Sequence, residues 1–379
     1  MSTAIIDARG WQNTFDLRSG DRVQSHTPVV NMVKGVLKNH PYPGDMDAGS
    51  NRWVSDTALE LIKEYNPRFV YLTYAAQYFK GRYNKMTADE RSRMIDNAFS
   101  ELQRFIDLSR FTAIVIGSGN MAPLMDTIDV TGLNGIAVCT NWSTKYAGLY
   151  EPSSADMKYL ESHPLIEKIV PREEIVSLFD GTPEQAARTP EFLMLARQGH
   201  TFRAMSPAMR VPVMIPADNF RIPLHIPVDG VDDLTDVRPA LERLIAQKNI
   251  ALIVMEGVGL DEFSMPHRPC INGKGWFFYE TGDAQHLALS SGEHRFFDYP
   301  KGYKHFDEVD NTREYPFSGY FKSIPANLFG SSFTGRSIAV GNKSMFMHMV
   351  TGADICVECF SRNLFNQGTM AVVHREDKL

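Results

Sequence analysis

The stretch Phe111-Thr-Ala-Ile-Val-Ile-Gly-Ser-Gly-Asn-Met-Ala-Pro123 decides the fold that the sequence predicts. Its residues from Ala113 to Gly117 are apolar or small, and small, flexible and polar residues follow at once. This pattern predicts a buried parallel strand that runs into a loop at its carboxyl end. Open α/β sheets keep their ligand sites at that edge. We therefore expect Ser118 and Asn120 to take part in binding a substrate.

The length and charge of the chain restrict the classes of protein to which it can belong. A chain of 379 residues predicts one large domain with an insertion, or two domains. A net charge of -6 and a pI near 6.0 argue against the basic surface that non-specific nucleic-acid binding needs. No apolar run approaches the roughly 18 residues of a membrane span, and the first residues lack the pattern of a secretory signal. We expect a cytoplasmic protein whose partner is a small molecule, with a homo-oligomer left open.

The four cysteines are too few for a disulfide framework in a chain of this length. Cys356-Val-Glu-Cys359 has the spacing of half a metal site or of a redox pair. The segment around it is apolar, and free cysteine is among the most buried residue types. We therefore favour structural thiols at both positions.

Alternating helical and strand patterns in the first part of the chain predict a mostly parallel central sheet flanked by helices, an α/β fold. Capping boxes at Thr57/Glu60 and Thr87/Glu90 predict two helix starts. The second helix carries one apolar face, formed by Met94, Ile95, Ala98, Leu102, Phe105 and Ile106. Strands are expected at residues 69–73, 113–116 and 135–139. Residues 1–150 are thus assigned to the first part of the α/β core.

Residues 151–210 are predicted to form a helical insertion or cap. Pro171, Pro183 and Pro190 each fit the first turn of a short helix. Residues 211–379 are assigned to the second part of the core, with long loops over the sheet edge. A helix pattern at 236–245 and a strand-and-glycine pattern at 250–259 there repeat the order found at 96–119. Glu256, Asp261 and Glu262 should consequently emerge at the same edge as Ser118.

Residues 54–130 resemble the alkaline phosphatase superfamily, in its type I phosphodiesterase and nucleotide pyrophosphatase branch. The resemblance depends on Asn66-Pro-Arg-Phe-Val-Tyr-Leu72, on a helix with Asp96 and Ala98, and on Ile114-Val-Ile-Gly-Ser-Gly-Asn-Met121. It implies an alkaline-phosphatase-like sheet with its site at the carboxyl edge. It also implies that Asp7 corresponds to a metal-binding Asp, and Ser50, followed by a substrate-binding Asn51, to the nucleophile. Turn capping is the alternative for Asp7 and Ser50.

The departures from the family pattern concern the metal ligands. The Asp and His that the family carries in two loops fall near Ala76 and Lys80 and on Ser118 and Gly119. These side chains do not bind zinc usefully. The resemblance therefore implies a divergent protein that acts on or binds a small anionic metabolite without the standard two-metal site. We expect a hydrolase-like or lyase-like enzyme, with a non-catalytic binding or regulatory protein as the alternative.

A second alternative reads Gly117-x-Gly119-x-x-Ala122 as the turn of an NADP-binding oxidoreductase. In that hypothesis main-chain N–H groups and a following helix hold the pyrophosphate. The strand at 135–139 lacks an acidic residue for a ribose hydroxyl, so a 2′-phosphate would fit better. Thr140, Ser143 and Lys145 are its candidate ligands.

Histidines gather in the loop-rich region beyond residue 264, at positions 267, 286, 294 and 305. None has a recognised metal-ligand spacing, yet a divalent metal stays open as a cofactor. A histidine beside a carboxylate can serve as a general base. We expect catalytic roles for His294, His305 and Glu256, and substrate binding by His267, Asp261 and Glu262.

Overall fold

The structure is a computed structural model. It describes residues 2–6, 13–16, 35, 38–44, 46–139, 145–183, 186, 189–203, 211–294, 338–340, 355–358 and 369–374. Asp7, Thr140, Ser143, His305 and Cys359, which carry sequence predictions, lie outside these residues.

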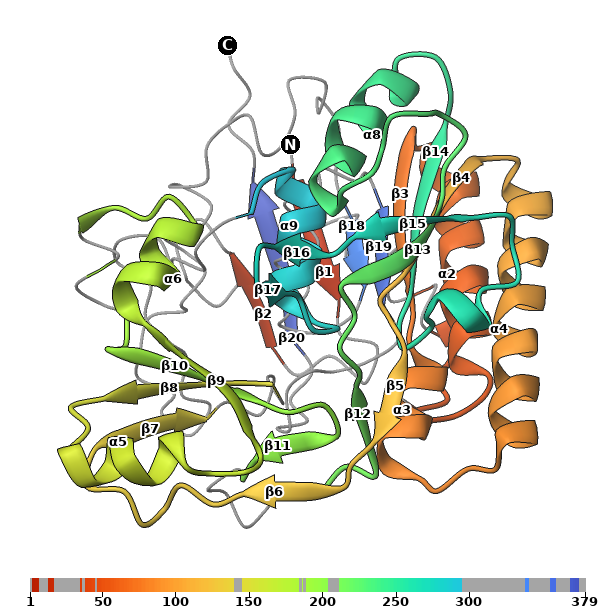
Figure 1. The fold of residues 1–379 in the computed structure, drawn as a ribbon. Coiled ribbons are helices and arrows are strands. Elements are labelled where there is room, and N and C mark those ends of the chain that lie inside the picture. The colour runs from red at the N-terminus through yellow and green to blue at the C-terminus, as the bar shows by residue number, and fades with distance from the viewer. Residues whose placement is uncertain are drawn as a thin grey trace.

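A ten-stranded sheet forms the centre of the molecule (Figure 1). Its spatial order is β15 (Arg268–Ile271), β13 (Arg221–His225), β4 (Thr112–Gly117), β14 (Ile250–Met255), β3 (Phe69–Tyr74), β19 (Ile355–Glu358), β18 (Ile338–Val340), β1 (Ser2–Ile6), β20 (Thr369–His374) and β2 (Asn13–Asp16). The strands from β4 to β1 in that order run parallel. Antiparallel pairings flank this parallel part on both sides, and β2 then pairs with β20 in parallel at one end. The expected α/β class and the parallel centre of the sheet are confirmed.

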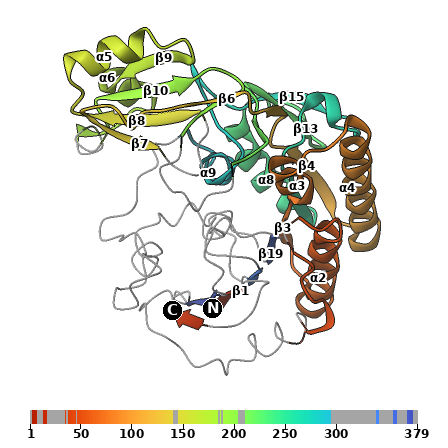
Figure 2. The ribbon, with the colours of Figure 1, turned by 90° about the horizontal axis from the view of Figure 1, so that it is seen from below.

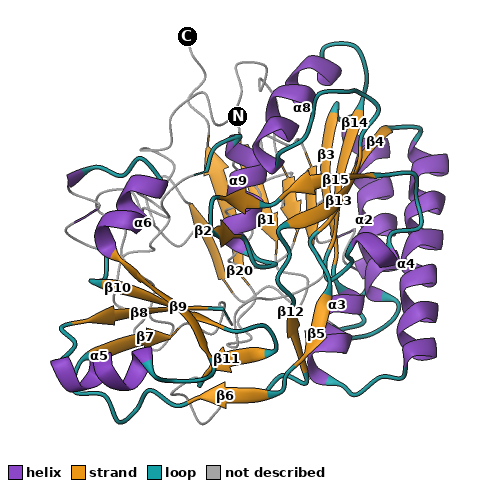
Figure 3. Cartoon of the chain, in the orientation of Figure 1, coloured by secondary structure: helices purple, strands orange, loops and turns teal. Residues whose placement is uncertain are grey.

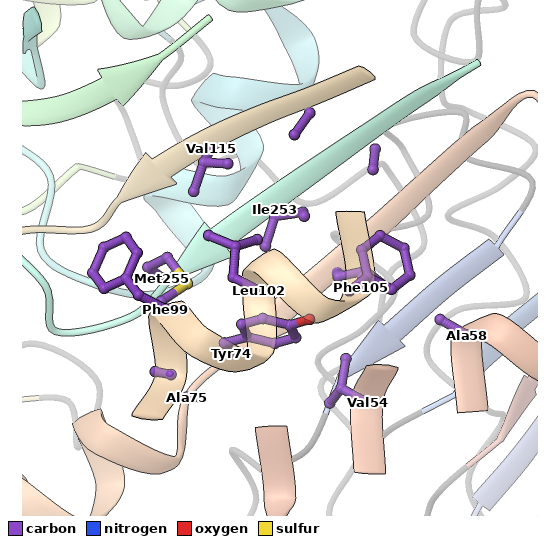
Figure 4. Packing of buried hydrophobic residues seen from close by; sticks show 14 of the residues in the cluster. Val54, Ala58, Tyr74, Ala75, Phe99, Leu102, Phe105, Val115, Ile253 and Met255 are labelled. Carbon is purple, nitrogen blue, oxygen red and sulfur yellow. The ribbon is translucent and has the colours of Figure 1, made fainter. Parts of the chain in front are cut away.

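Helices cover both faces of the described part of the sheet (Figures 1 and 2). On one face lie α2 (Ser50–Tyr65) and α4 (Ala88–Ser109), with the shorter α3 (Ala76–Tyr83) beside them. On the other lie α8 (Val237–Ile245) and α9 (Asp283–Ser291). Each face of β3, β4 and β14 buries its own apolar cluster. Figure 4 shows the first, where Leu102 and Phe105 of α4 approach Ile253 of β14.

The predicted start of α4 is confirmed, whereas that of α2 is wrong. The Thr87 hydroxyl accepts from the Glu90 amide, and the Glu90 carboxylate accepts from the Thr87 amide. Helix α2 instead begins at Ser50, seven residues before the expected capping box, with Gly49 as its N-cap. Thr57 therefore lies inside the helix, where its buried hydroxyl has no hydrogen-bond partner in the described part of the chain. The polar residues at 50, 51 and 55 face buried partners and so conceal the apolar periodicity of the first two turns.

The expected helical insertion at 151–210 is wrong in its main element, which is a four-stranded antiparallel sheet (Figure 3). Its order is β7 (Ile136–Cys139), β8 (Tyr146–Tyr150), β10 (Phe192–Ala196) and β9 (Ile166–Pro171). Two short helices, α5 (Ser154–Glu161) and α6 (Arg172–Leu178), accompany it, and Pro183 and Ala186 are also helical, as expected at Pro183. Pro171 does precede α6, but the five residues after Glu191 pair with β8 and β9 on both sides. Strands β7 and β8 of this sheet precede residue 151, so the sheet extends across the expected boundary.

Short two-stranded ribbons connect this smaller sheet to the central one. They pair β5 (Met121–Pro123) with β12 (Met214–Pro216), and β6 (Asp126–Ile128) with β11 (His200–Phe202). A third ribbon, β16 (Gly273–Lys274) and β17 (Phe277–Phe278), packs against the smaller sheet. The Tyr146 hydroxyl donates to the Phe278 carbonyl at 2.9 Å and accepts from the Phe278 amide at 3.2 Å. These contacts fix the smaller sheet to the core.

Two prolines face each other at one end of the central sheet. Pro223 of β13 pairs in register with Pro269 of β15, the terminal strand. Beyond β15, the amide of Ile271 donates to the Asp232 carbonyl at 2.7 Å. Among the described residues, no helix combines the length and apolar character needed to cross a membrane.

Candidate functional site

The carboxyl ends of β3, β14 and β4 bring the predicted edge residues together. Their register sets Val254 beside both Thr73 and Ile116. Ser118 and Glu256 follow two residues later on the face covered by α9. The Gly257 amide donates to the Ser118 hydroxyl at 2.8 Å. The expectation that Ser118 and Glu256 share one edge of the sheet is confirmed.

A buried chain of titratable groups lies at this edge. His286 of α9 has its Nε2 3.1 Å from a carboxylate oxygen of Glu256, and its Nδ1 contacts the Tyr71 hydroxyl. The side chains of His286 and Glu256 are each 1% exposed. An ionised carboxylate only accepts hydrogen bonds, so Nε2 donates to it, and Nδ1 can then accept from Tyr71. Both imidazole nitrogens are thus engaged by protein groups.

The Ser118-Gly-Asn120 loop uses all its main-chain donors within the protein. The amides of Ser118 and Gly119 each donate at 3.1 Å, to the carbonyls of Met255 and Val258. The Asn120 amide donates to Asn219 Oδ1 at 2.8 Å. A dinucleotide-binding turn needs such donors free for phosphate oxygens. This loop offers a pyrophosphate no main-chain N–H group.

Three further features count against the dinucleotide hypothesis at this loop. Strand β5 follows the loop, where that hypothesis requires a helix. A Cβ atom on Gly117 would lie 2.3 Å from the Val258 carbonyl oxygen, so packing within the protein explains this glycine. Lys145 is 4% exposed, and its ammonium pairs with Glu167 at 2.6 Å and Asp218 at 2.8 Å. It is therefore not placed to receive a 2′-phosphate.

The start of α2 lies at the same edge of the sheet. Its two predicted site residues, Ser50 and Asn51, make hydrogen bonds within the protein. The Ser50 hydroxyl donates to the Asp47 carbonyl at 2.9 Å and also contacts the Gly44 carbonyl. This is the turn capping that was the alternative to a nucleophile. Asn51 is buried, and its amide donates to Gln77 Oε1 at 3.0 Å. Gln77 in turn donates to the Glu256 carbonyl at 2.8 Å.

The histidines at 267 and 294 lie outside the buried cluster. His267 is exposed, and its Nδ1 lies 2.8 Å from the Met265 carbonyl. The His294 ring stacks on Tyr279, and its Nε2 lies 3.1 Å from Asp233 Oδ1. Burial raises the pKa of Asp233, but hydrogen bonds from His294 and Thr235 outweigh it and leave that pKa below its usual value. The structure thus gives His294 a carboxylate partner, at a place separate from Glu256.

The two acidic residues after Gly259 lie at the outer rim of the edge. Asp261 is exposed. Glu262 pairs with Arg91 of α4 through both carboxylate oxygens, at 2.5 and 2.7 Å. Arg91 also donates to the Gly257 carbonyl at 2.7 Å, and its buried Nη1 has no hydrogen-bond partner among the described residues. An arginine of α4 with one unpaired nitrogen therefore lies against the loop 257–262.

Sequence reasoning missed the residues that connect the edge loops. Gln285 donates to the Ser118 carbonyl at 3.1 Å and to Asn272 Oδ1 at 2.9 Å. Asn272 donates to the carbonyls of Asn219 and Tyr279. His286 was named only as one of a group of histidines. The glycines on either side of α9, Gly282 and Gly292, were a local signal for this helix.

Within the part of the chain that the structure describes, no three His, Cys, Asp or Glu side chains gather to hold a metal ion. The sequence matches no protein-family model, and a search of curated proteins found no match either.

Proposed function

We propose that this chain is a divergent, alkaline-phosphatase-like protein that binds a small anionic metabolite at the carboxyl edge of β3, β4 and β14. Binding takes place around the loop 257–262, without the standard two-metal centre. The buried chain of Tyr71, His286 and Glu256 holds the edge in place beneath the binding site.

One observation carries this proposal: two hydrogen-bond donors beside the loop 257–262 have no acceptor among the described residues. They are Arg91 Nη1 and the side-chain amide of Asn120. Arg91 Nη1 is buried, and a buried donor without an acceptor costs about 1–3 kcal/mol. An anionic oxygen at this place relieves that cost and gains a charge-assisted hydrogen bond from the guanidinium.

Binding is favoured over turnover because the expected reactive groups are engaged elsewhere. The Ser50 hydroxyl contacts two carbonyl oxygens, and both nitrogens of His286 contact protein groups. The second candidate function is hydrolase-like or lyase-like catalysis. The pairing of His286 with Glu256 favours it, since a carboxylate that orients an imidazole is a common arrangement for a general base.

The test of the proposal is a titration of the full chain with orthophosphate. Binding is measured by calorimetry in the presence of a metal chelator. We expect saturable binding that the chelator does not weaken. Arg91→Gln should weaken binding by about tenfold to a hundredfold, because a hydrogen bond to a charged group contributes about 1.5–3 kcal/mol. Arg93→Gln is the matched control, since Arg93 lies exposed on the same helix.

Arg91→Gln also leaves Glu262 without its partner, so the double variant Arg91→Gln, Glu262→Gln separates the two effects. It should bind orthophosphate as weakly as the single variant. Wild-type protein that binds neither orthophosphate nor sulfate would contradict the proposal. Release of nitrophenol from p-nitrophenyl phosphate only after addition of Zn²⁺ or Mn²⁺ would replace it with metal-dependent catalysis.

A further inference from the structure

The main chain of Asn120 is held from both sides by one buried side chain. Asn219, 5% exposed, accepts from the Asn120 amide at 2.8 Å and donates to the Asn120 carbonyl at 3.1 Å. Its Nδ2 also donates to the Ala217 carbonyl at 2.9 Å. A side-chain amide bonded to both main-chain groups of another residue fixes the orientation of that residue.

Two glycines make room for this arrangement. Gly119 has a φ of +121°, and a Cβ atom there would lie 2.3 Å from Asn219 Cγ. A Cβ atom on Gly259 would lie 1.7 Å from Asn120 Oδ1. The first glycine therefore admits the Asn219 side chain, and the second admits the side chain of Asn120 itself. Any other residue at either position would displace one of the two amides.

A second row of buried amides supports Asn219. Asn272, fully buried, donates to the Asn219 carbonyl at 2.9 Å, and Gln285 donates to Asn272 Oδ1 at 2.9 Å. The side chain of Asn120, which is half-buried, makes no hydrogen bond to any described residue. The buried side-chain amides of Asn219, Asn272 and Gln285 thus fix Asn120. The side-chain amide of Asn120 itself remains available to a ligand. A half-buried amide held in this way is suited to contact a ligand.

We propose that Asn219 is a positioning residue, which aims the side-chain amide of Asn120 at an oxygen of the bound anion. This inference rests on the proposed function and assigns roles to two residues of the binding site. Asn120 Nδ2 donates to the ligand, and Asn219 acts only through Asn120. The ligand must present an acceptor oxygen to Asn120 Nδ2, because Asn120 Oδ1 lies against Gly259.

A double-mutant cycle with orthophosphate as the probe tests the inference on the full chain. Asn120→Ala and Asn219→Ala should each weaken binding by about tenfold to a hundredfold, as expected for one lost hydrogen bond to a charged group. Asn219→Ala should have no further effect in the Asn120→Ala background, because it acts through that side chain. Asn219→Asp keeps the acceptor for the Asn120 amide but sets a carboxylate oxygen against the Asn120 and Ala217 carbonyls, so it should lose at least as much affinity as Asn219→Ala.

The side-chain amide signal of Asn120 in ¹⁵N spectra gives a readout that a general loss of stability would not mimic. This signal should shift on addition of orthophosphate to the wild type. Asn219→Asp replaces Asn219→Ala in the double-mutant cycle if Asn219→Ala does not fold. The inference would be overturned by unchanged affinity in Asn120→Ala or by additive losses in the double variant. In either case Arg91→Gln still reports on the proposed function. Wild-type protein that binds no orthophosphate would remove the proposed function and this inference with it.

Discussion

At the scale of single residues, the carboxyl edge is held by polar side chains that water does not reach. Three of these side chains are at most 1% exposed: Ser118, Glu256 and His286. The first two follow the ends of β4 and β14, and the third lies in α9, so the three are far apart in the sequence. A buried carboxylate is tolerated only where a partner compensates its lost hydration. The His286 ring supplies that compensation for Glu256, which makes the pair sensitive to the loss of either member.

His286→Ala should lower the free energy of unfolding by about 3–5 kcal/mol, because it leaves a buried carboxylate without its imidazole. Denaturant titration measures the effect. Exposed His267 provides the control, and His267→Ala should change stability by no more than about 0.5 kcal/mol. The double variant Glu256→Gln, His286→Ala should lose less than His286→Ala alone. Equal losses would argue that the carboxylate is not charged in the folded protein.

At the scale of elements, the two helices next to β3 illustrate what a local pattern can predict. Helix α4 has a capping box and one apolar face, and both signals agree with the structure. Helix α2 begins at a glycine without a side-chain cap. Its Thr57 and Glu60 have the spacing of a capping box by coincidence of sequence. Whether the Thr57 hydroxyl caps or is buried depends on tertiary packing.

Threonine-to-valine substitutions at Thr57 and Thr87 should therefore have opposite effects. Thr87→Val removes the N-cap of α4 and should cost about 1 kcal/mol. Thr57→Val replaces a buried hydroxyl that has no partner, and should leave stability unchanged or raise it. Thermal unfolding of the two variants gives the comparison. A loss of stability in Thr57→Val similar to that in Thr87→Val would contradict the assigned start of α2.

The parts of the fold that sequence predicts are those fixed by nearby residues. Strands β3, β4 and β14 are short apolar runs because both their faces are buried, and each was predicted. The smaller sheet was missed because Pro171 and Pro190 resemble helix starts, whereas pairing with distant strands decides the structure of 192–196. For the same reason Ser118 and Glu256 were placed together correctly, but Gln77, Asn219 and His286 were not assigned. Their partners lie on other elements.

At the scale of the whole molecule, Lys145 joins the smaller sheet to the core. Its ammonium contacts Glu167 of β9 and Asp218 next to β13, and lies 5.4 Å from the centre of the Phe278 ring. Glu167 and Asp218 are partly exposed, with side chains 42% and 20% accessible, so water screens part of this interaction.

Lys145→Met should destabilise the attachment of the smaller sheet by about 2 kcal/mol, less than for a fully buried pair. Hydrogen exchange should accelerate in β8 and β10 and remain slow in β14, because the central sheet keeps its own apolar clusters. Lys158→Met, at an exposed position of α5, is the control. Equal acceleration in all three strands would show that the two sheets unfold as one unit.

The facing prolines at the end of the central sheet have a consequence for association between copies of the chain. Opposed residues of an antiparallel pair either exchange hydrogen bonds or point their main-chain groups outward, and prolines must do the latter. Pro269 therefore presents no donor to the outside of β15, and the outward amide of Ile271 is already bound by Asp232. A strand from another molecule finds no ladder to extend at these two positions. This end of the sheet is protected against edge-to-edge aggregation.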